Sequence, residues 1–144
     1  MSGQGKGASA MSGGESRRTI LLVEEDDETR RVLKANLEAE GYRVLSALDE
    51  EDACDRVGGG GAEADLVLVN LVGKAPEAGL AAGRRIRAHA GYDGLTPLVV
   101  MAEKYGEDVE GTDVNVGGND WITYPEDHDQ LRNLLARLLD QPAN

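Results

Sequence analysis

The sequence has few of the features of a secreted or membrane protein. It contains a single cysteine, Cys54, so no disulfide can form within the chain, which favours a reducing compartment. No run approaches the ~20 apolar residues that a membrane-spanning helix needs. The first 18 residues also lack the apolar segment of a secretion signal. We therefore expect a cytoplasmic protein without a membrane partner.

Basic residues are also scarce. Fifteen Lys and Arg stand against 27 Asp and Glu, which gives a formal net charge of −12 at pH 7. A surface this acidic repels phosphate backbones, so we expect no nucleic-acid partner. The 144 residues suffice for one domain with a hydrophobic core but not for two ordinary domains.

Two regions differ in composition. Residues 1–18 are mostly Gly, Ser and short polar residues without apolar periodicity, which predicts a disordered tail before a domain over 19–141. Within the domain, short apolar runs alternate with helical patterns. The expected strands cover 19–23, 42–47, 65–70, 95–102 and 120–123, and the expected helices cover 27–40, 49–57, 79–89 and 128–139. This order predicts an α/β fold with a doubly wound, five-stranded parallel sheet, a flavodoxin-like (βα)5 architecture.

The segment 103–119 fits this alternation poorly. A fourth helix is expected there, but the segment contains Gly106 and Gly111 together with several β-branched residues. Each interior glycine costs a helix about 1 kcal/mol relative to alanine. We therefore predict a helix that is short or irregular.

Polar residues follow the strands at the edge where parallel sheets form their functional sites. Glu24, Glu25 and Asp26 end the first strand, and Asn70 ends the otherwise apolar strand DLVLVN. Carboxylates here would repel the phosphate of a bound nucleotide, which argues against a dinucleotide or flavin enzyme. They suit a hard cation such as Mg²⁺ instead.

Several motifs together resemble the receiver domain of response regulators, of the chemotaxis-regulator type. They are LLVEEDDETRRVLKANLEAEGYRVLSA, DLVLVN, TPLVVMA and WITYP before a leucine-rich helix, and they extend from residue 19 to about 140. The resemblance implies that Glu24 and Glu25 correspond to Mg²⁺ ligands and position 70 to a phosphoaccepting Asp. It also implies a hydroxyl residue at position 101, an aromatic switch at 121, and a Lys at 124 joined to Pro125 by a cis peptide bond.

Three of these positions depart from the family pattern. Asn70 has a carboxamide, which is a poor nucleophile and cannot form an acyl phosphate. Met101 offers no hydroxyl and Tyr124 no ammonium to a phosphoryl group. Trp121 retains the aromatic character of the switch position. The resemblance thus implies a degenerate pseudo-receiver.

These departures indicate a stand-alone, phosphorylation-independent protein-interaction module in bacterial signal transduction. The sequence ends five residues after Leu139, so we expect no output domain. The resemblance implies a partner-binding face over 103–139, including Tyr105, Trp121 and Leu131, and we expect a monomer or weak dimer. No nucleophile is paired with a base, so we expect no enzyme activity.

Two alternatives remain. In the first, Glu24, Glu25 and Asp26 bind a cation and the domain responds to it; Mg²⁺ binding is expected to be weak or lost, and no other cofactor is implied. In the second, Glu25 or Asp26 accepts a phosphoryl group. The missing Lys and Thr disfavour the second.

Overall fold

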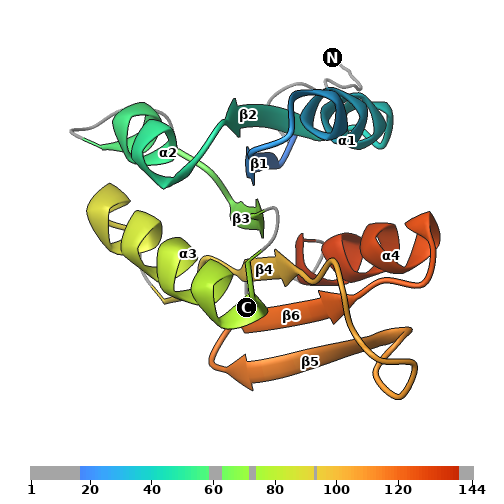
Figure 1. The fold of residues 1–144 in the computed structure, drawn as a ribbon. Helices are drawn as coiled ribbons and strands as arrows, with labels where there is room; N and C mark the ends of the chain where they lie inside the picture. Colours follow the sequence, from blue (N-terminus) through green and yellow to red (C-terminus); the bar gives the residue numbers. More distant parts are fainter. Residues whose placement is uncertain (1–16, 59–62, 72–73, 93, 140–144) are drawn as a thin grey trace, which may run out of the picture.

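The structure is a computed structural model that describes residues 17–58, 63–71, 74–92 and 94–139 (Figure 1). Apart from residues 17 and 18, the tail expected over 1–18 lies outside the described residues, as does most of the loop expected over 58–64. The helices are α1 (Asp27–Ala39), α2 (Glu50–Val57), α3 (Pro76–Ala90) and α4 (His128–Leu139). The strands are β1 (Thr19–Glu24), β2 (Arg43–Ala47), β3 (Leu66–Asn70), β4 (Leu98–Met101), β5 (Thr112–Gly117) and β6 (Asp120–Tyr124).

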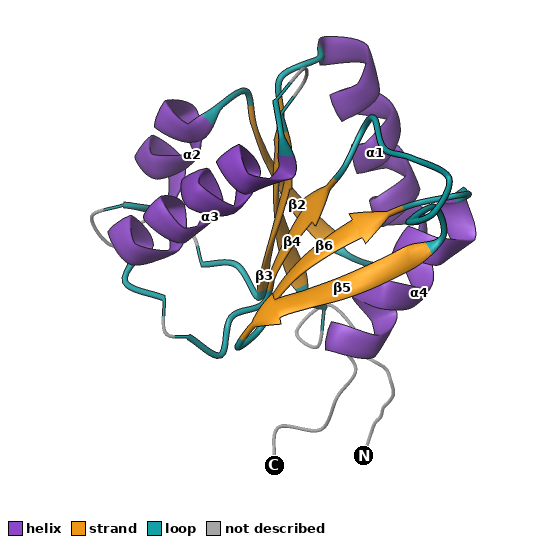
Figure 2. Ribbon diagram, turned by 60° about the horizontal axis from the view of Figure 1, so that its bottom comes forward, coloured by secondary structure: helices purple, strands orange, loops and turns teal. Residues whose placement is uncertain are grey.

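One sheet carries all these strands, in the order β2-β1-β3-β4-β6-β5. The neighbouring strands from β2 to β6 are parallel, and β5 pairs with β6 in the antiparallel direction. Figure 2 shows α2 and α3 on one face of the sheet and α1 and α4 on the other. The α/β fold and its helix-covered parallel sheet are confirmed.

Each face of the sheet has its own hydrophobic core. Every residue of β1 and β3 is buried, as expected for central parallel strands covered on both faces. Val67 and Val69 pack towards α2 and α3, whereas Leu66 and Leu68 pack towards α1 and α4. Leu131, Leu134 and Leu135 of α4 complete the second core.

The fourth helix expected over 103–119 is absent from the described chain, and the prediction of a five-stranded sheet was wrong. Strand β5 adds a sixth, antiparallel edge strand. Gly111, Gly117 and Gly118 have φ of 84°, 127° and 54°, a left-handed region that ends a helix but suits the turns at both ends of β5. The two-residue turn Gly118-Asn119 joins β5 to β6, which is a common hairpin connection.

A polar network fastens this hairpin to α4. The carboxylate of Asp113 in β5 accepts hydrogen bonds from Thr123 Oγ1 at 2.7 Å and from Gln130 Nε2 at 2.9 Å. Arg137 lies 3.7 Å from the same carboxylate. Thr123 has no exposed surface, so its hydroxyl depends on a protein acceptor. The network connects β5, β6 and α4 where a helix was expected.

The peptide bond before Pro125 also differs from what the resemblance implies. No peptide bond in the described residues is cis, so the bond expected from the resemblance is trans here. The residue before Pro125 is a tyrosine, and its ring packs against the core between the sheet and α3.

We predict that Asp113→Ala destabilises the domain by about 1–3 kcal/mol, because it leaves the buried Thr123 hydroxyl without its acceptor. Urea unfolding followed by circular dichroism measures the change. The matched control is Glu110→Ala, an exposed carboxylate just before β5, which should change stability by no more than about 0.5 kcal/mol. Equal stability losses in both variants would contradict a structural role for the network.

Candidate functional site

The candidate site lies at the carboxyl ends of β1 and β3. Glu24 and Asn70 are the last residues of these strands and are aligned in the parallel register. Both side chains are buried, with 0% and 6% of their surface exposed. Asn70 Nδ2 donates a hydrogen bond of 2.6 Å to Glu24 Oε1. The amide at the expected phosphoacceptor position therefore binds the carboxylate at the expected metal position.

The second oxygen of Glu24 is also engaged. Glu24 Oε2 accepts a hydrogen bond of 3.1 Å from the backbone N–H of Asp26. Burial raises the pKa of the Glu24 carboxyl above its ordinary value, and the hydrogen bonds from Asp26 and Asn70 oppose this rise. The negative charges of Glu103 and Asp26 raise the same pKa further. Glu24 is thus a buried acid whose two oxygens are bound by neutral donors.

Asn70 leaves one polar atom unmatched. Its Oδ1 is buried and has no hydrogen-bond partner among the described residues. A buried acceptor without a donor is unfavourable by about 1–3 kcal/mol. An orphaned oxygen beside a carboxylate is an observation that favours a bound cation or proton.

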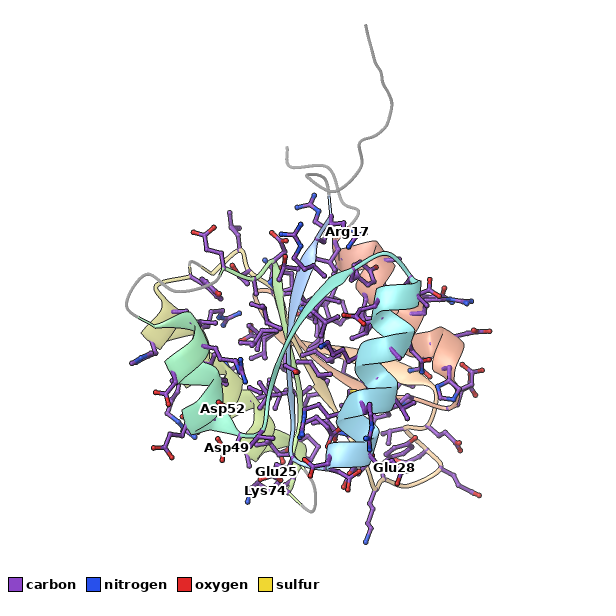
Figure 3. All side chains as sticks on the ribbon, turned by 90° about the horizontal axis from the view of Figure 1, so that it is seen from above. Arg17, Glu25, Glu28, Asp49, Asp52 and Lys74 are labelled. Carbon is purple, nitrogen blue, oxygen red and sulfur yellow. The ribbon has the colours of Figure 1, made fainter. Side chains whose placement is uncertain are left out.

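The other two residues predicted to bind a metal, Asp26 and Glu25, lie in different surroundings. Asp26 is the N-cap of α1, where its Oδ2 accepts from the Thr29 N–H at 2.8 Å, and this bond holds the pKa of the Asp26 carboxyl below its ordinary value. Glu25 is exposed, and Figure 3 shows it with Glu28 and Lys74 at the end of the domain opposite Arg17. Within the described residues no three acidic, His or Cys side chains gather to hold a metal ion. In this arrangement the three carboxylates do not converge on one point.

The other three positions that the resemblance assigns, 101, 121 and 124, lie on different faces of the sheet. Met101 and Trp121 pack towards α1 and α4, whereas Tyr124 packs towards α3. Tyr124 meets Tyr105 edge-on, with ring centroids 5.4 Å apart, and the Tyr105 hydroxyl donates to the backbone carbonyl of Pro125. Apolar and aromatic atoms thus fill the end of the sheet where the resemblance expects a hydroxyl and an ammonium.

The predicted partner face is only partly at the surface. Tyr105 and Trp121 are half-buried, and the Arg137 guanidinium lies over the Trp121 ring, 5.7 Å from its centroid. Trp121 Nε1 has no hydrogen-bond partner within the described chain. Leu131 was predicted at this face, but it is only 8% exposed because α4 uses it to pack against the sheet.

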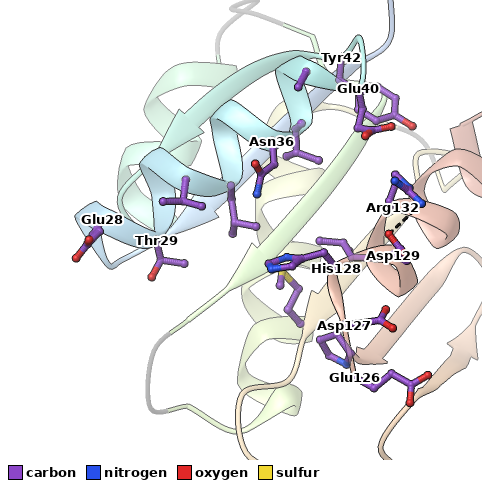
Figure 4. A pocket seen from close by; sticks show the side chains of 17 residues that line it. Glu28, Thr29, Asn36, Glu40, Tyr42, Glu126, Asp127, His128, Asp129 and Arg132 are labelled. Atoms are coloured by element: carbon purple, nitrogen blue, oxygen red, sulfur yellow. Dashed lines mark ion pairs between the residues drawn. The ribbon is translucent and has the colours of Figure 1, made fainter.

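Sequence reasoning missed a groove between α1 and α4. Its volume is about 950 Å³, and Figure 4 shows its side chains arriving from α1 and from the segment that leads into α4. Met101 and Pro125 connect the groove to the carboxyl end of the sheet. Val32 of α1 lines it with 51% of its surface exposed. Helical periodicity places Val32 on the same face of α1 as Leu33 and Leu37, but it does not show how far that face lies from α4.

The buried carboxyl predicts a pH dependence of folding stability. Because the pKa of Glu24 is raised in the folded state, wild type should lose stability as pH rises from about 4.5, the ordinary value, through the raised pKa. Glu24→Gln cannot ionise, so its stability relative to wild type should increase over this interval and level off above it. Urea unfolding at a series of pH values measures this difference.

The exposed Glu25→Gln substitution removes the same charge from the neighbouring position and is the matched control. It should follow the wild-type profile. A stability difference between Glu24→Gln and wild type that is the same at every pH would contradict the buried-acid assignment.

Two curated proteins are similar to this chain in sequence. No family model matches the chain. It is 32% identical over 119 residues to the uncharacterized transcriptional regulatory protein YkoG of Bacillus subtilis, an alignment covering 83% of this chain and 48% of YkoG. It is 33% identical over 129 residues to the aerobic respiration control protein ArcA of Escherichia coli, covering 84% and 50%. The chain spans about half the length of these curated relatives.

Solved structures give the fold. The chemotaxis protein CheY4 of Vibrio cholerae matches with a TM-score of 0.63 and 22% identity, over 85% of this chain and 99% of CheY4. The response regulator TrrA of Thermotoga maritima, solved in complex with Mg²⁺ and BeF, matches with a TM-score of 0.59 and 20% identity, over 84% and 98%. The chain thus has the CheY-like fold of a response-regulator receiver domain.

Proposed function

We propose that this domain is a pseudo-receiver, which binds a protein partner in bacterial two-component signalling without being phosphorylated. The observation that carries the proposal is the hydrogen bond from Asn70 to Glu24. The donor of this bond is a carboxamide at the position where a receiver needs its nucleophile. The acceptor is the carboxylate that would bind the metal. Met101 and Tyr124 support the proposal, because they replace the hydroxyl and the ammonium that assist phosphoryl transfer.

The proposed output is contact with another protein rather than catalysis or DNA binding. The net charge of −12 disfavours nucleic acid as the ligand. No helix in the described part of the chain is long and apolar enough to cross a membrane. We also propose a cytoplasmic protein, because its single cysteine suits a reducing compartment. A monomer or weak dimer is part of the same proposal.

Incubation with Mg²⁺ and acetyl phosphate, a small phosphodonor, tests the absence of phosphoryl transfer. Intact mass spectrometry of wild type should show no added phosphoryl group, because an amide cannot form the acyl phosphate. The triple variant Asn70→Asp/Met101→Thr/Tyr124→Lys restores the carboxylate, the hydroxyl and the ammonium, and it should gain one phosphoryl group. Modification of wild type at any carboxylate would overturn the proposal.

A second candidate function, a cation-responsive domain, is favoured by the orphaned Asn70 Oδ1 beside Glu24. A cation there would take the place of the Asn70 amide at the Glu24 carboxylate. Titration with Mg²⁺, followed by the fluorescence of Trp121, the single tryptophan, separates the two candidates. The pseudo-receiver proposal predicts no saturable change. A saturable change in wild type and in Glu25→Gln that is lost in Glu24→Gln would favour the cation-responsive function instead.

A further inference from the structure

We infer that two copies of this chain associate through strand β5, whose free edge pairs with the same strand of a second copy in the antiparallel direction. The two sheets then become one continuous sheet across a two-fold axis. The contact belongs to the part of the chain that departs from the expected fold, because β5 stands where the resemblance implied a helix. It goes beyond the pseudo-receiver proposal and does not involve the site at Asn70.

Strand β5 is an open edge of the sheet. It comes last in the strand order β2-β1-β3-β4-β6-β5, and Figures 1 and 2 show it as the outermost strand on its side. Five of its six residues are exposed, whereas only one of the five residues of β2, the opposite edge, is exposed. An exposed edge strand is a template for pairing with another chain.

The hydrogen bonds of β6 show which backbone groups of β5 are free. The Thr123 carbonyl accepts a hydrogen bond of 3.0 Å from the residue that follows β4, so the backbone groups of Thr123 face β4. Because this direction alternates along a strand, Ile122 faces β5 and forms a hydrogen-bonded pair with Val114. Asp113 and Asn115 flank Val114, so their N–H and C=O groups face away from β6.

Two outward-facing residues with one residue between them define a two-fold symmetric register. When Val114 lies opposite Val114 of the second copy, Asp113 lies opposite Asn115 of the second copy, and the reverse. Each of these two outer pairs exchanges two backbone hydrogen bonds, so four bonds cross the axis. The valines form the non-hydrogen-bonded pair, where opposite side chains lie closest and β-branched residues pack well. The edge is therefore complementary to itself.

The charges of β5 permit this register. Asp113 is the only charged residue of the strand, and it lies opposite the neutral Asn115 of the second copy rather than opposite another carboxylate. Its carboxylate already accepts two hydrogen bonds within its own chain and lies 3.7 Å from Arg137. Strand β5 contains no Lys or Pro, the residues that commonly keep sheet edges apart. The bulge between Asn115 and Gly117 lies outside the three central residues.

The contact is small, so the dimer should be weak. Pairing covers Val114, whose exposed fraction is 41%, and only a few neighbouring side chains. An interface below about 1,200 Å² is typical of transient complexes, and we expect a dissociation constant of about 0.1 mM. Each copy carries a net charge of −12, so long-range repulsion opposes association at low salt.

Other occupants of the edge fit less well. Residues 1–16 contain no valine, isoleucine or threonine, so this segment is a poor source of a sixth residue pair or of any added strand. A strand of another protein needs only the free backbone groups. The match of Asp113 with Asn115, and of Val114 with itself, is specific to a second copy.

Sedimentation equilibrium of the full chain tests the association. Wild type should change from monomer to dimer as its concentration rises to about 1 mM. Higher salt should strengthen the dimer, because salt screens the repulsion between two acidic copies.

Amide hydrogen exchange tests the register. The N–H groups of Asp113 and Asn115 should exchange more slowly as the protein concentration rises, because they become donors in the dimer. The N–H of Val114 lies between them and faces β6 in the monomer already, so its exchange should slow less.

Matched variants locate the contact. Val114→Lys puts two like charges directly opposite each other while leaving the backbone bonds to β6 in place, and it should weaken the dimer at least tenfold. Val32→Lys makes the same change at an exposed position of α1, and it should not weaken the dimer. A mixture of Val114→Lys with Val114→Glu should form a heterodimer, because position 114 lies opposite itself. Circular dichroism verifies that each variant is folded.

Four outcomes would overturn the inference. Wild type that stays a monomer up to about 1 mM has no such dimer. Equal association of Val114→Lys and Val32→Lys would place the contact elsewhere, and a mixture of Val114→Lys and Val114→Glu that stays monomeric would exclude the two-fold register. Slower exchange of Asp113 and Asn115 only after another protein is added would make that protein the occupant.

The dimer and the pseudo-receiver proposal fail separately. None of the four outcomes involves phosphoryl transfer, so the dimer can be wrong while the pseudo-receiver proposal stands. Conversely, uptake of a phosphoryl group by wild type would overturn that proposal and leave the pairing of β5 unaffected.

Discussion

The hydrogen bond between Asn70 and Glu24 joins the neighbouring strands β1 and β3 at their carboxyl ends, where parallel sheets form their functional sites. The parallel register of β1 and β3 brings the two residues side by side, and burial on both faces of the sheet removes water as an alternative partner. A buried carboxylate needs donors, and here the donors are an amide and a backbone N–H rather than a metal ion. The arrangement satisfies Glu24 but leaves the Asn70 oxygen unmatched.

The fold differs from the expected one at strand β5, which forms the edge of the sheet opposite β2. Strand β5 replaces a helix, so the face of β6 that holds Ile122 is bordered by Val114 and by the Tyr105–Tyr124 pair. On the other face, Asp113, Thr123 and Gln130 connect the hairpin to α4. In the described chain, the segment that was expected to form a fourth helix therefore contributes a strand to the sheet.

The sequence predicted the core better than the edges. The apolar strands and the leucine-rich last helix predicted the parallel sheet, because these residues need to be buried. The segment DLVLVN also predicted that a strand ends at Asn70, as it does. The edge strand was missed because the family alternation was given more weight than the local pattern: Thr112, Val114 and Val116 alternate with polar residues, and Gly118-Asn119 is a hairpin signal. Leu131 was assigned to the partner face by the resemblance, although helical periodicity puts it in the same stripe as the buried Leu134 and Leu135. Val32 shares a helical face with Leu33 and Leu37, but periodicity does not give the distance of that face from the next helix, and Val32 is 51% exposed.

The central claim is that the Asn70–Glu24 pair closes the site to metal and phosphoryl groups. The most direct measurement is the ¹H–¹⁵N spectrum of wild type before and after addition of Mg²⁺ together with beryllofluoride, a phosphoryl mimic, following the side-chain amide of Asn70 and the indole of Trp121. We predict that both signals stay in place. A saturable shift of both signals, either with Mg²⁺ alone or only when the mimic is also present, would contradict the claim, because the site would still accept a metal or a phosphoryl-like ligand.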